Sequence, residues 1–521
     1  MIGVLYSYDD RNAGELVVAA LQRSVSETLV ARISINEISR NNCILAINPD
    51  EGYGQALISW LASGRRKLIL FGSLPECLCT HFNLRNTVWP EKAELWSRSL
   101  PAESGYYSES KGNIKYSELA SQLGANNWFR PLERFDFADE WNNLGYGAIR
   151  VDDSIWSIAA PLRASEGSEV AAISFEEQAF ATYVALFNSH ISSTFWVNRP
   201  VGFIDSFEWY LLEAFISEWR HLDMLPCLPV ISEIPYGYDA AITMRLDCDE
   251  DIFSAQPLWS AYKNLGVPLS LALHTSNLPN PVHEDFLKSF INDGGVLLSH
   301  TATHAPNWGG SYDAAYHEAI ESRCKIESST GIRVNYAVSP FHQSPPYALA
   351  ALCDAGYSGC IGGIIRNDPE FLIARGGKLA NLPDGFIGHS QQTMLHGDCM
   401  LADGDPLKVF KQAFNQALET RTLFGFLDHP FSSRYQYGWV DEQRRIDAHQ
   451  ALIGHIRATA RQPLFMDECQ AMDFLRDRAA IRLHLCEKAF AVSVPFENAS
   501  YEYAVQFRGE LVKLNDGMVL V

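Results

Sequence analysis

The stretch Ala241–Asp251, AITMRLDCDED, constrains the fold of this chain more than any other. An apolar and β-branched run ends in a burst of carboxylates, which predicts a buried strand that delivers charge to its carboxyl end. Side chains on a strand alternate between two faces, so Arg245, Asp247 and Asp249 should share one face while Cys248 points to the other. Two carboxylates this close favour a cation between them.

A second polar group follows the expected strand Val296–Leu298. His300 and His304 lie in the run Ser-His-Thr-Ala-Thr-His, at a spacing that places both on one face of a helical turn. Two carboxylates after one strand and two imidazoles after another make a plausible site for a divalent metal ion. A D-x-D pair alone is more often a solvated turn or helix cap, and the histidines make the metal hypothesis the stronger one.

Strand-like and helix-like runs alternate regularly after Asp251. They predict a (β/α) barrel of seven or eight strands within residues 236–475, with reactive side chains at the carboxyl ends of the strands. The further expected strands are Val267–Leu273, Val334–Ser339, Gly359–Ile364, Gln391–Leu395, Thr422–Leu427 and Pro463–Met466, and the expected helices include Pro406–Glu419 and Trp439–Ala460. Polar residues at other strand ends are His274, His342, His396, Asp398, Asp428 and His429; of these, His274, His342 and His396 are expected to be hydrogen-bonded residues rather than ligands.

The rest of the chain divides into three further parts, as expected for 521 residues, which exceed what one hydrophobic core usually serves. Residues 1–125 predict an open, largely parallel α/β domain of flavodoxin-like or amidotransferase-like type. Residues 126–235 form an aromatic-rich connecting region. Residues 476–521 consist of short alternating runs and predict a small β module.

Composition excludes several classes of function. A formal net charge of −21 argues against nucleic-acid binding. There is no apolar run of about 18 residues, so we expect no membrane span, and no secretion signal is visible at the N-terminus, so we expect a cytoplasmic protein. The eleven cysteines are scattered and suit reduced thiols better than a disulfide framework. The oligomeric state is not predicted.

Four motifs carry a resemblance to a known family. At Asp247-Cys248-Asp249, His300-Thr-Ala-Thr-His304, Val-Ser-Pro340-Phe341 and Leu-Asp-His429 the chain resembles polysaccharide deacetylases of the NodB-homology, carbohydrate esterase family 4 type. The D-x-D form is similar to that of biofilm exopolysaccharide deacetylases. The resemblance covers about residues 236–475. It implies a metal-dependent hydrolase that removes N-acetyl or O-acetyl groups from an acetylated poly- or oligosaccharide, with zinc as the expected ion and cobalt, manganese or nickel as alternatives.

The resemblance also implies roles for individual residues. Asp247 would be the base and Asp249, His300 and His304 the metal ligands, although the two aspartates could exchange roles. The family's R-x-P-Y motif is V-S-P-F here, so Arg245 is expected to replace the missing arginine beside the base. The remaining implied roles are an oxyanion contact from the backbone N–H of Phe341 and a proton donor, His429, with Glu468 as the alternative acid.

Other hypotheses stay open. A barrel glycosidase would explain the acidic run, but Asp251 stands where its glutamate is needed, and the histidines would have no role. A catalytically degenerate glycan-binding protein would suit the tryptophan-rich middle region. A metal-dependent amidase acting on a non-carbohydrate substrate would keep the same centre. Asp313, His317 and Glu318 are expected to form only a solvated helix face.

Overall fold

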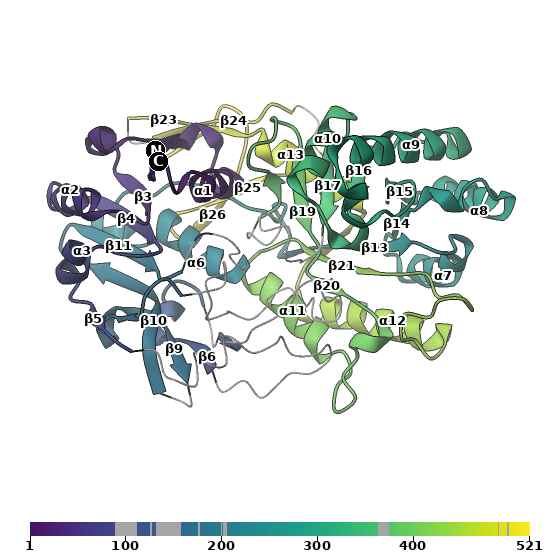
Figure 1. Cartoon of the computed structure of the whole chain (residues 1–521), viewed down its shortest axis with the longest axis horizontal. Coiled ribbons are helices and arrows are strands. Elements are labelled where there is room, and N and C mark those ends of the chain that lie inside the picture. The colour runs from purple at the N-terminus through teal and green to yellow at the C-terminus, as the bar shows by residue number, and fades with distance from the viewer. Residues whose placement is uncertain are drawn as a thin grey trace.

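The computed structural model describes residues 1–88, 112–125, 128–131, 158–175, 178–199, 201, 206–362, 375–487, 489–496 and 500–521. Two α/β halves lie side by side, and the N- and C-termini lie close together in the first half (Figure 1). Residues 132–157 of the aromatic-rich region expected at 126–235 lie outside the described residues.

The first half is built on a nine-stranded sheet in the order β2-β1-β3-β4-β11-β10-β9-β6-β7. Its first five strands are parallel, and the order 2-1-3-4 with one more parallel strand is that of flavodoxin-like sheets. The other four are antiparallel to their neighbours. The strands are β1 (Ile2–Leu5), β2 (Val30–Arg32), β3 (Cys43–Ile47), β4 (Arg66–Phe71), β6 (Gly112–Tyr116), β7 (Phe129–Pro131), β9 (Glu169–Phe175), β10 (Gln178–Asn188) and β11 (Ser192–Val197).

This sheet crosses the boundary expected at residue 125, because β9, β10 and β11 complete it from the region expected to be a connector. Helices pack on its faces, and a short ladder of β5 (Arg85–Asn86) with β8 (Leu162–Arg163) lies apart from it. The helices of this half are α1 (Arg11–Ser24), α2 (Glu51–Ala62), α3 (Glu76–His81), α5 (Glu118–Ser121) and α6 (Ser206–Ser217).

The second half is built on a ten-stranded sheet in the order β18-β19-β17-β16-β15-β14-β13-β21-β20, with β22 also paired to β13. All its pairs are parallel except β18 with β19. The strands are β13 (Ala240–Cys248), β14 (Ser270–Leu273), β15 (Val296–Ser299), β16 (Tyr336–Val338), β17 (Gly359–Gly362), β18 (Gly377–Lys378), β19 (Ile387–Ser390), β20 (Thr393–Met394), β21 (Phe424–Asp428) and β22 (Pro463–Met466).

The expected closed barrel is not confirmed, because no pairing among the described residues closes this sheet. The segment expected as one strand at 391–395 is instead divided. The Gln391 N–H donates to the carbonyl of Gly362, the last residue of β17, and the Gln392 N–H donates to the Gly425 carbonyl of β21. One short segment therefore contacts β17 and β21, which lie near opposite ends of the sheet order.

Local sequence explains the main elements of this half. Every residue of β13 is buried, as expected for a strand covered on both faces. Helix α8 begins with Pro281 after Asn280, whose side chain accepts the Val282 N–H, and α7 ends at Gly266 in the left-handed conformation. The helices are α7 (Gln256–Leu265), α8 (Pro281–Asn292), α9 (Tyr312–Thr330), α10 (Pro346–Asp354), α11 (Lys408–Glu419), α12 (Glu442–Thr459) and α13 (Glu468–Ala479).

The C-terminal residues form two small antiparallel sheets. One joins β12 (Val230–Ile231) to β25 (Ala504–Phe507) and β26 (Glu510–Lys513), and the other joins β23 (Arg482–Cys486), β24 (Ala489–Ser493) and β27 (Val519–Leu520). Among the described residues, no helix is both long and apolar enough to cross a lipid bilayer.

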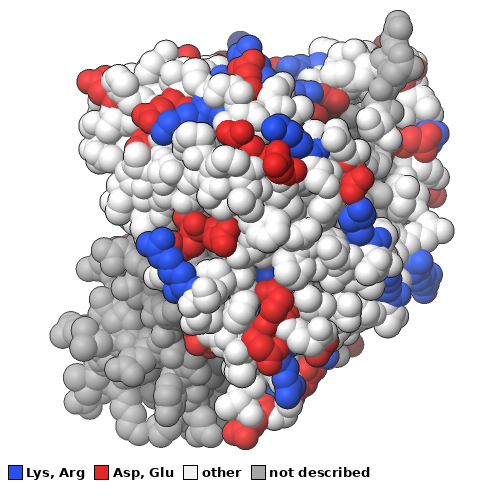
Figure 2. Space-filling view, turned by 90° about the vertical axis from the view of Figure 1, so that its right-hand side faces the viewer, with Lys and Arg blue, Asp and Glu red and all other residues white. Residues whose placement is uncertain are grey.

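The surface of the second half carries charges of both signs. Figure 2 looks at this half and shows acidic and basic side chains interspersed with uncharged surface. The net charge of −21 is therefore not gathered into one acidic patch on this face.

Candidate metal centre

Strand β13 places an arginine and a carboxylate on the same face. The Nε of Arg245 donates to Oδ1 of Asp247 at 2.7 Å, and Nη2 donates to Oδ2 at 3.2 Å. The exposed fractions of the two side chains are 0% and 2%. Burial alone would raise the pKa of Asp247, but Arg245 and His300 reverse this and lower it to about 2. Asp247 therefore stays ionised in a buried place.

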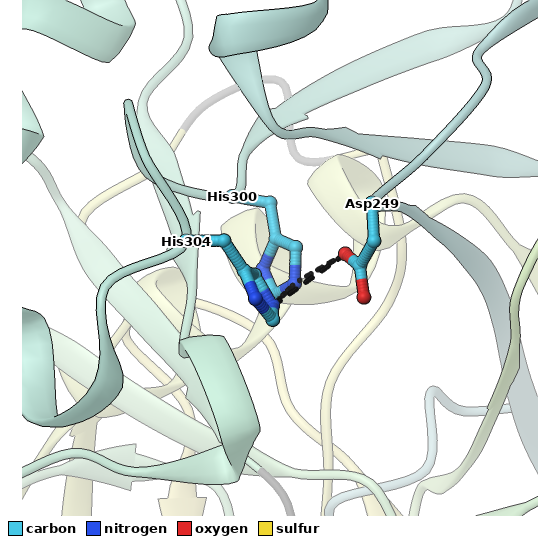
Figure 3. A group of neighbouring side chains, drawn as sticks. All are labelled: Asp249, His300 and His304. Carbon is cyan, nitrogen blue, oxygen red and sulfur yellow. Dashed lines mark hydrogen bonds and ion pairs between the residues drawn. The ribbon is translucent and has the colours of Figure 1, made fainter.

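Asp249 and two histidines converge beside this pair (Figure 3). The Oδ1 atom of Asp249 lies 3.2 Å from Nε2 of His300 and 3.5 Å from Nε2 of His304. The two Nε2 atoms are 3.1 Å apart. The Nδ1 of His300 contacts the Val338 carbonyl at 3.1 Å, which places its proton there and leaves Nε2 free to bind a ligand. One potential ligand atom of each of the three side chains lies within 4.8 Å of the others.

The electrostatics of these groups suit metal binding. Burial would raise the pKa of Asp249, but His429 and His300 hold it well below its ordinary value. Burial and the neighbouring His300 lower the pKa of His304 to about 4, so its imidazole is neutral at pH 7 and has a free lone pair. Asp249 Oδ1 is buried and accepts no hydrogen bond of good geometry from the described residues.

The His300–His304 segment is not the helical turn that the spacing suggested. Thr301 and His304 have φ values of 69° and 54°, in the left-handed region. The Thr301 hydroxyl accepts the His304 N–H at 2.9 Å. A tight turn held by the threonine, rather than a helix, therefore brings the two rings together. Non-glycine residues in this conformation are strained, and such strain is commonly found at functional sites.

Glu318 of α9 holds the same turn from outside. Its Oε2 accepts the N–H groups of Ala302 and Thr303, both at 2.8 Å, and the Thr303 hydroxyl donates to Oε1. The expectation that Glu318 lies on a merely solvated face was therefore wrong. Helical periodicity reveals which face a residue occupies, but not that a loop from another strand covers that face.

His429 reaches Asp249 from the opposite side. Its Nε2 lies 3.3 Å from Oδ2 of Asp249, and its Nδ1 lies 2.7 Å from Nε2 of His396. Its ring stacks on Tyr437, with centroids 4.2 Å apart. Burial would lower the pKa of His429, but Asp249 raises it above the ordinary value. His396 is a hydrogen-bonded neighbour, as expected, and Tyr437 was not anticipated from the sequence.

A buried network fixes the strand end that carries His429. The carboxylate of Asp428 accepts the His429 N–H at 2.7 Å, Nε of Arg445 at 2.7 Å and Nε2 of His449 at 2.9 Å. The Tyr262 hydroxyl contacts Nδ1 of His449 at 2.9 Å. Because Asp428 is already occupied by these donors, we interpret His396, Asp428 and His429 as a hydrogen-bonded group, although their spacing alone would also suit a metal ion.

The remaining candidates lie around this centre. The Phe341 ring packs against the His304 ring in a tilted arrangement, with centroids 4.4 Å apart, and Phe341 and the buried His342 both have left-handed backbones. Burial lowers the pKa of His342 to about 3. Nδ1 of His274 contacts the Asp249 carbonyl at 3.0 Å, so His274 positions the backbone of Asp249.

Glu468, the alternative acid, begins α13 directly after β22. It is fully buried, and its Oε1 accepts a hydrogen bond from Nε2 of Gln391 at 2.7 Å. Burial raises its pKa to about 7. Among the described residues, no hydrogen bond or ion pair joins it to Asp249 or His429, whereas His429 contacts Asp249 directly.

Comparisons with known proteins give structural matches only. No family model matches the chain, and no curated protein matches its sequence. Similar solved structures include polysaccharide deacetylases of carbohydrate esterase family 4. One, described as a polysaccharide deacetylase from Mycobacterium smegmatis, is 12% identical, with 49% of this chain and 96% of that chain covered and a TM-score of 0.38.

Two other matches differ in what their names imply. The chitin deacetylase of Colletotrichum lindemuthianum is 15% identical, with 46% and 92% of the chains covered and a TM-score of 0.31. A carbohydrate esterase family 4 pseudoenzyme from Bacillus anthracis is 12% identical, with 45% and 66% covered and a TM-score of 0.30. At these scores the similarity carries no argument about activity, which depends on the geometry of the site.

Proposed function

We propose that the chain is a metal-dependent hydrolase that removes N-acetyl or O-acetyl groups from a poly- or oligosaccharide. The observation that carries the proposal is the convergence of two differently partnered carboxylates with three histidines at the carboxyl ends of parallel strands. Asp247 is paired with Arg245, whereas the ion-pair partners of Asp249 among the described residues are all imidazoles. Reactive residues of α/β proteins gather at this end of the sheet.

The residues present fit a divalent ion. Asp249, His300 and His304 supply one carboxylate and two imidazoles, which suit zinc and leave a position for water. The buried Asp249 Oδ1 accepts no good hydrogen bond from the described residues, as expected of an atom reserved for a cation. When bound, such an ion lowers the pKa of water and polarises a carbonyl group.

Asp247 is suited to be the base. Its carboxylate is ionised, held in one orientation by two hydrogen bonds from Arg245, and placed two residues before the ligand Asp249. It accepts the proton of the water that adds to the acetyl carbon. Arg245 balances the buried negative charge before that proton arrives, which is the task of the arginine absent from the V-S-P-F segment.

His429 is suited to be the acid. Because its Nδ1 faces His396, its Nε2 is the atom that delivers a proton towards the reacting centre. Asp249 raises its pKa, which favours the protonated ring. As the C–N bond breaks, this proton passes to the departing nitrogen, so that acetate and a free amine leave. We assign the Phe341 N–H to the carbonyl oxygen that becomes negative.

Metal content and acetate release, measured on the same samples, test the proposal. The wild type should hold about one ion per chain by elemental mass spectrometry and release acetate from N-acetylated oligosaccharides. The Asp249→Ala and His304→Ala variants should lose both properties. The matched control is His317→Ala, because His317 is exposed on α9 and bonds only to a carbonyl of its own helix.

The possible outcomes test the substrate and the metal centre separately. Parallel assays on an O-acetylated glycan distinguish ester from amide substrates. Metal without acetate release from either glycan would reject the sugar substrate. A folded wild type that takes up no zinc, cobalt, manganese or nickel would reject the metal centre.

A further inference from the structure

A cavity lies between the two halves of the protein. It has a volume of about 130 Å³ and is enclosed by α6, β12, the β25–β26 pair and the turn at Arg421. This is roughly ten times the volume that a single water requires. Its polar lining includes Glu213, Ser217, Glu218, Glu233, Arg375 and Arg421.

The acidic side chains of the cavity already have partners. Glu213 accepts Nε and Nη2 of Arg375 at 3.0 and 2.6 Å, and Glu233 accepts Nη1 of Arg375 at 3.4 Å. Glu233 also accepts the backbone N–H of Leu423 at 3.1 Å. Glu218 accepts a hydrogen bond from the Gln506 amide at 3.2 Å. Arg375, Glu213 and Glu233 therefore form one network, and Glu218 has a separate partner.

Arg421 has no such partner. Among the described residues, its side chain makes one long hydrogen bond, 3.5 Å from Nη2 to the Ser232 hydroxyl, and its buried Nε makes none. No carboxylate of the described residues forms an ion pair with it. Burial and the neighbouring Arg375 lower its pKa, so the surroundings disfavour its positive charge. A buried guanidinium N–H without an acceptor costs free energy.

Two further observations point to the same place. Ser217 is 1% exposed and also lines the cavity, and its hydroxyl has no hydrogen-bond partner in the part of the chain that the structure describes. The backbone of Arg421 has a φ of 53°, a strained conformation for a residue other than glycine. The turn thus keeps the arginine at the cavity despite this strain. Both groups without partners are hydrogen-bond donors.

We propose that this cavity binds a small oxyanion, a carboxylate or a phosphate group, through Nε of Arg421 and the hydroxyl of Ser217. Such a ligand supplies the acceptor oxygens and the negative charge that Arg421 lacks. It would bridge α6 of the first half to the turn directly before β21, the strand that ends at Asp428. The site is separate from the candidate metal centre, and the proposal does not depend on the proposed function.

Calorimetric titration of the full chain in Tris chloride, with sodium phosphate and sodium acetate as the two probes, tests the site. Sodium chloride at matched ionic strength serves as the blank. We expect one phosphate or acetate per chain, and at least a tenfold weaker affinity in Arg421→Gln. The matched control is Arg508→Gln, because Arg508 also has a left-handed backbone, with a φ of 53°, but is exposed and does not line the cavity.

Binding of phosphate alone or acetate alone supports the site and identifies the source of the oxyanion. A selenate soak should then give an anomalous peak between Arg421 and Ser217. If neither probe binds beyond the chloride blank, or if Arg421→Gln binds as the wild type does, the proposal is overturned. Should that variant fail to fold, Ser217→Ala replaces it, with several-fold weaker binding expected and unchanged binding counting against the site.

Discussion

Replacing Arg245 with methionine tests the electrostatic design of the candidate centre. The substitution keeps much of the side-chain volume and removes the guanidinium that binds both oxygens of Asp247. Both partners are buried, with exposed fractions of 0% and 2%, so water does not replace the lost contacts. The variant leaves a buried carboxylate without its main counter-charge.

The expected loss of stability follows from the pKa of Asp247. The fall from the ordinary value of 3.8 to about 2 corresponds to roughly 2.5 kcal/mol of folding free energy. Because burial acts in the opposite direction and persists in the variant, the cost at pH 7 should be larger, about 3–5 kcal/mol.

The pH dependence has a definite sign. In the wild type the depressed pKa contributes stability that is present above about pH 4 and is lost as pH falls towards 2. In the variant, burial without Arg245 raises the pKa of Asp247, so the carboxylate protonates more readily. The difference between the two proteins should therefore be small near pH 3 and should grow towards pH 7.

Urea unfolding at several pH values, with a chelator present, measures this difference. Arg32→Met is the matched control, because Arg32 forms an exposed ion pair with Glu15 and should cost less than about 1 kcal/mol. In assays of acetate release, the acidic limb of the rate against pH should move to higher pH for Arg245→Met, because the pKa of Asp247 is higher in the variant. A cost at pH 7 no larger than that of the control, or one independent of pH, would refute the reasoning.

Three further substitutions separate the roles of neighbouring groups. Glu468→Gln should be more stable than the wild type by about 3 kcal/mol at pH 9 and of similar stability near pH 5. The pKa of Glu468 is raised from 4.5 to about 7, so the wild type loses stability as the pH rises through 7. Urea unfolding at both pH values measures this difference. Glu318→Ala should weaken metal affinity about 10- to 100-fold through the His304 turn, measured by chelator competition, and unchanged affinity would exclude that positioning role. His396→Ala should lower kcat for acetate release by about tenfold or more while metal content stays constant, because the substitution removes the hydrogen-bond partner of His429 Nδ1. A loss of metal as large as the loss of activity would indicate that His396 is a metal ligand instead.

The sequence predicts the strands of the second half better than their assembly. The apolar run before Asp247 forms β13 as expected, because burial on both faces leaves a clear local pattern. The run Pro463–Met466 also forms a strand, β22, although its residues are only partly buried up to Met466. Whether the sheet closes into a barrel could not be predicted from such local patterns. The segment at 391–395 divides between β17 and β21, and that choice depends on contacts distant in sequence.

The first sheet shows the same limit. The expected open parallel sheet is present in β1 to β4, but the sheet continues into β9, β10 and β11 beyond residue 125. Period-two alternation indicates a strand without indicating its partner or its direction. Domain boundaries drawn from composition therefore miss strands that return to an earlier sheet.

At the candidate centre, residue types were more informative than local geometry. Asp249, His300 and His304 come together as the spacing suggested, but through a strained turn rather than a helix. A signal for the buried network around Asp428 was present in α12, where Arg445 and His449 are polar residues four positions apart on one face. Both are buried there, and polar groups on the core side of a helix indicate a buried polar partner.

The two aspartates of β13 could have exchanged their roles on sequence grounds, and their partners now argue for one assignment. Both oxygens of Asp247 are engaged by Arg245, and a cation beside that guanidinium would be repelled. Among the described residues, the Asp249 carboxylate contacts the imidazoles of His300, His304 and His429, which bind a metal through a deprotonated nitrogen or donate a proton to a leaving group. The arginine two residues before the base thus repels a metal from Asp247, and we infer that Asp249 is the ligand and Asp247 the base.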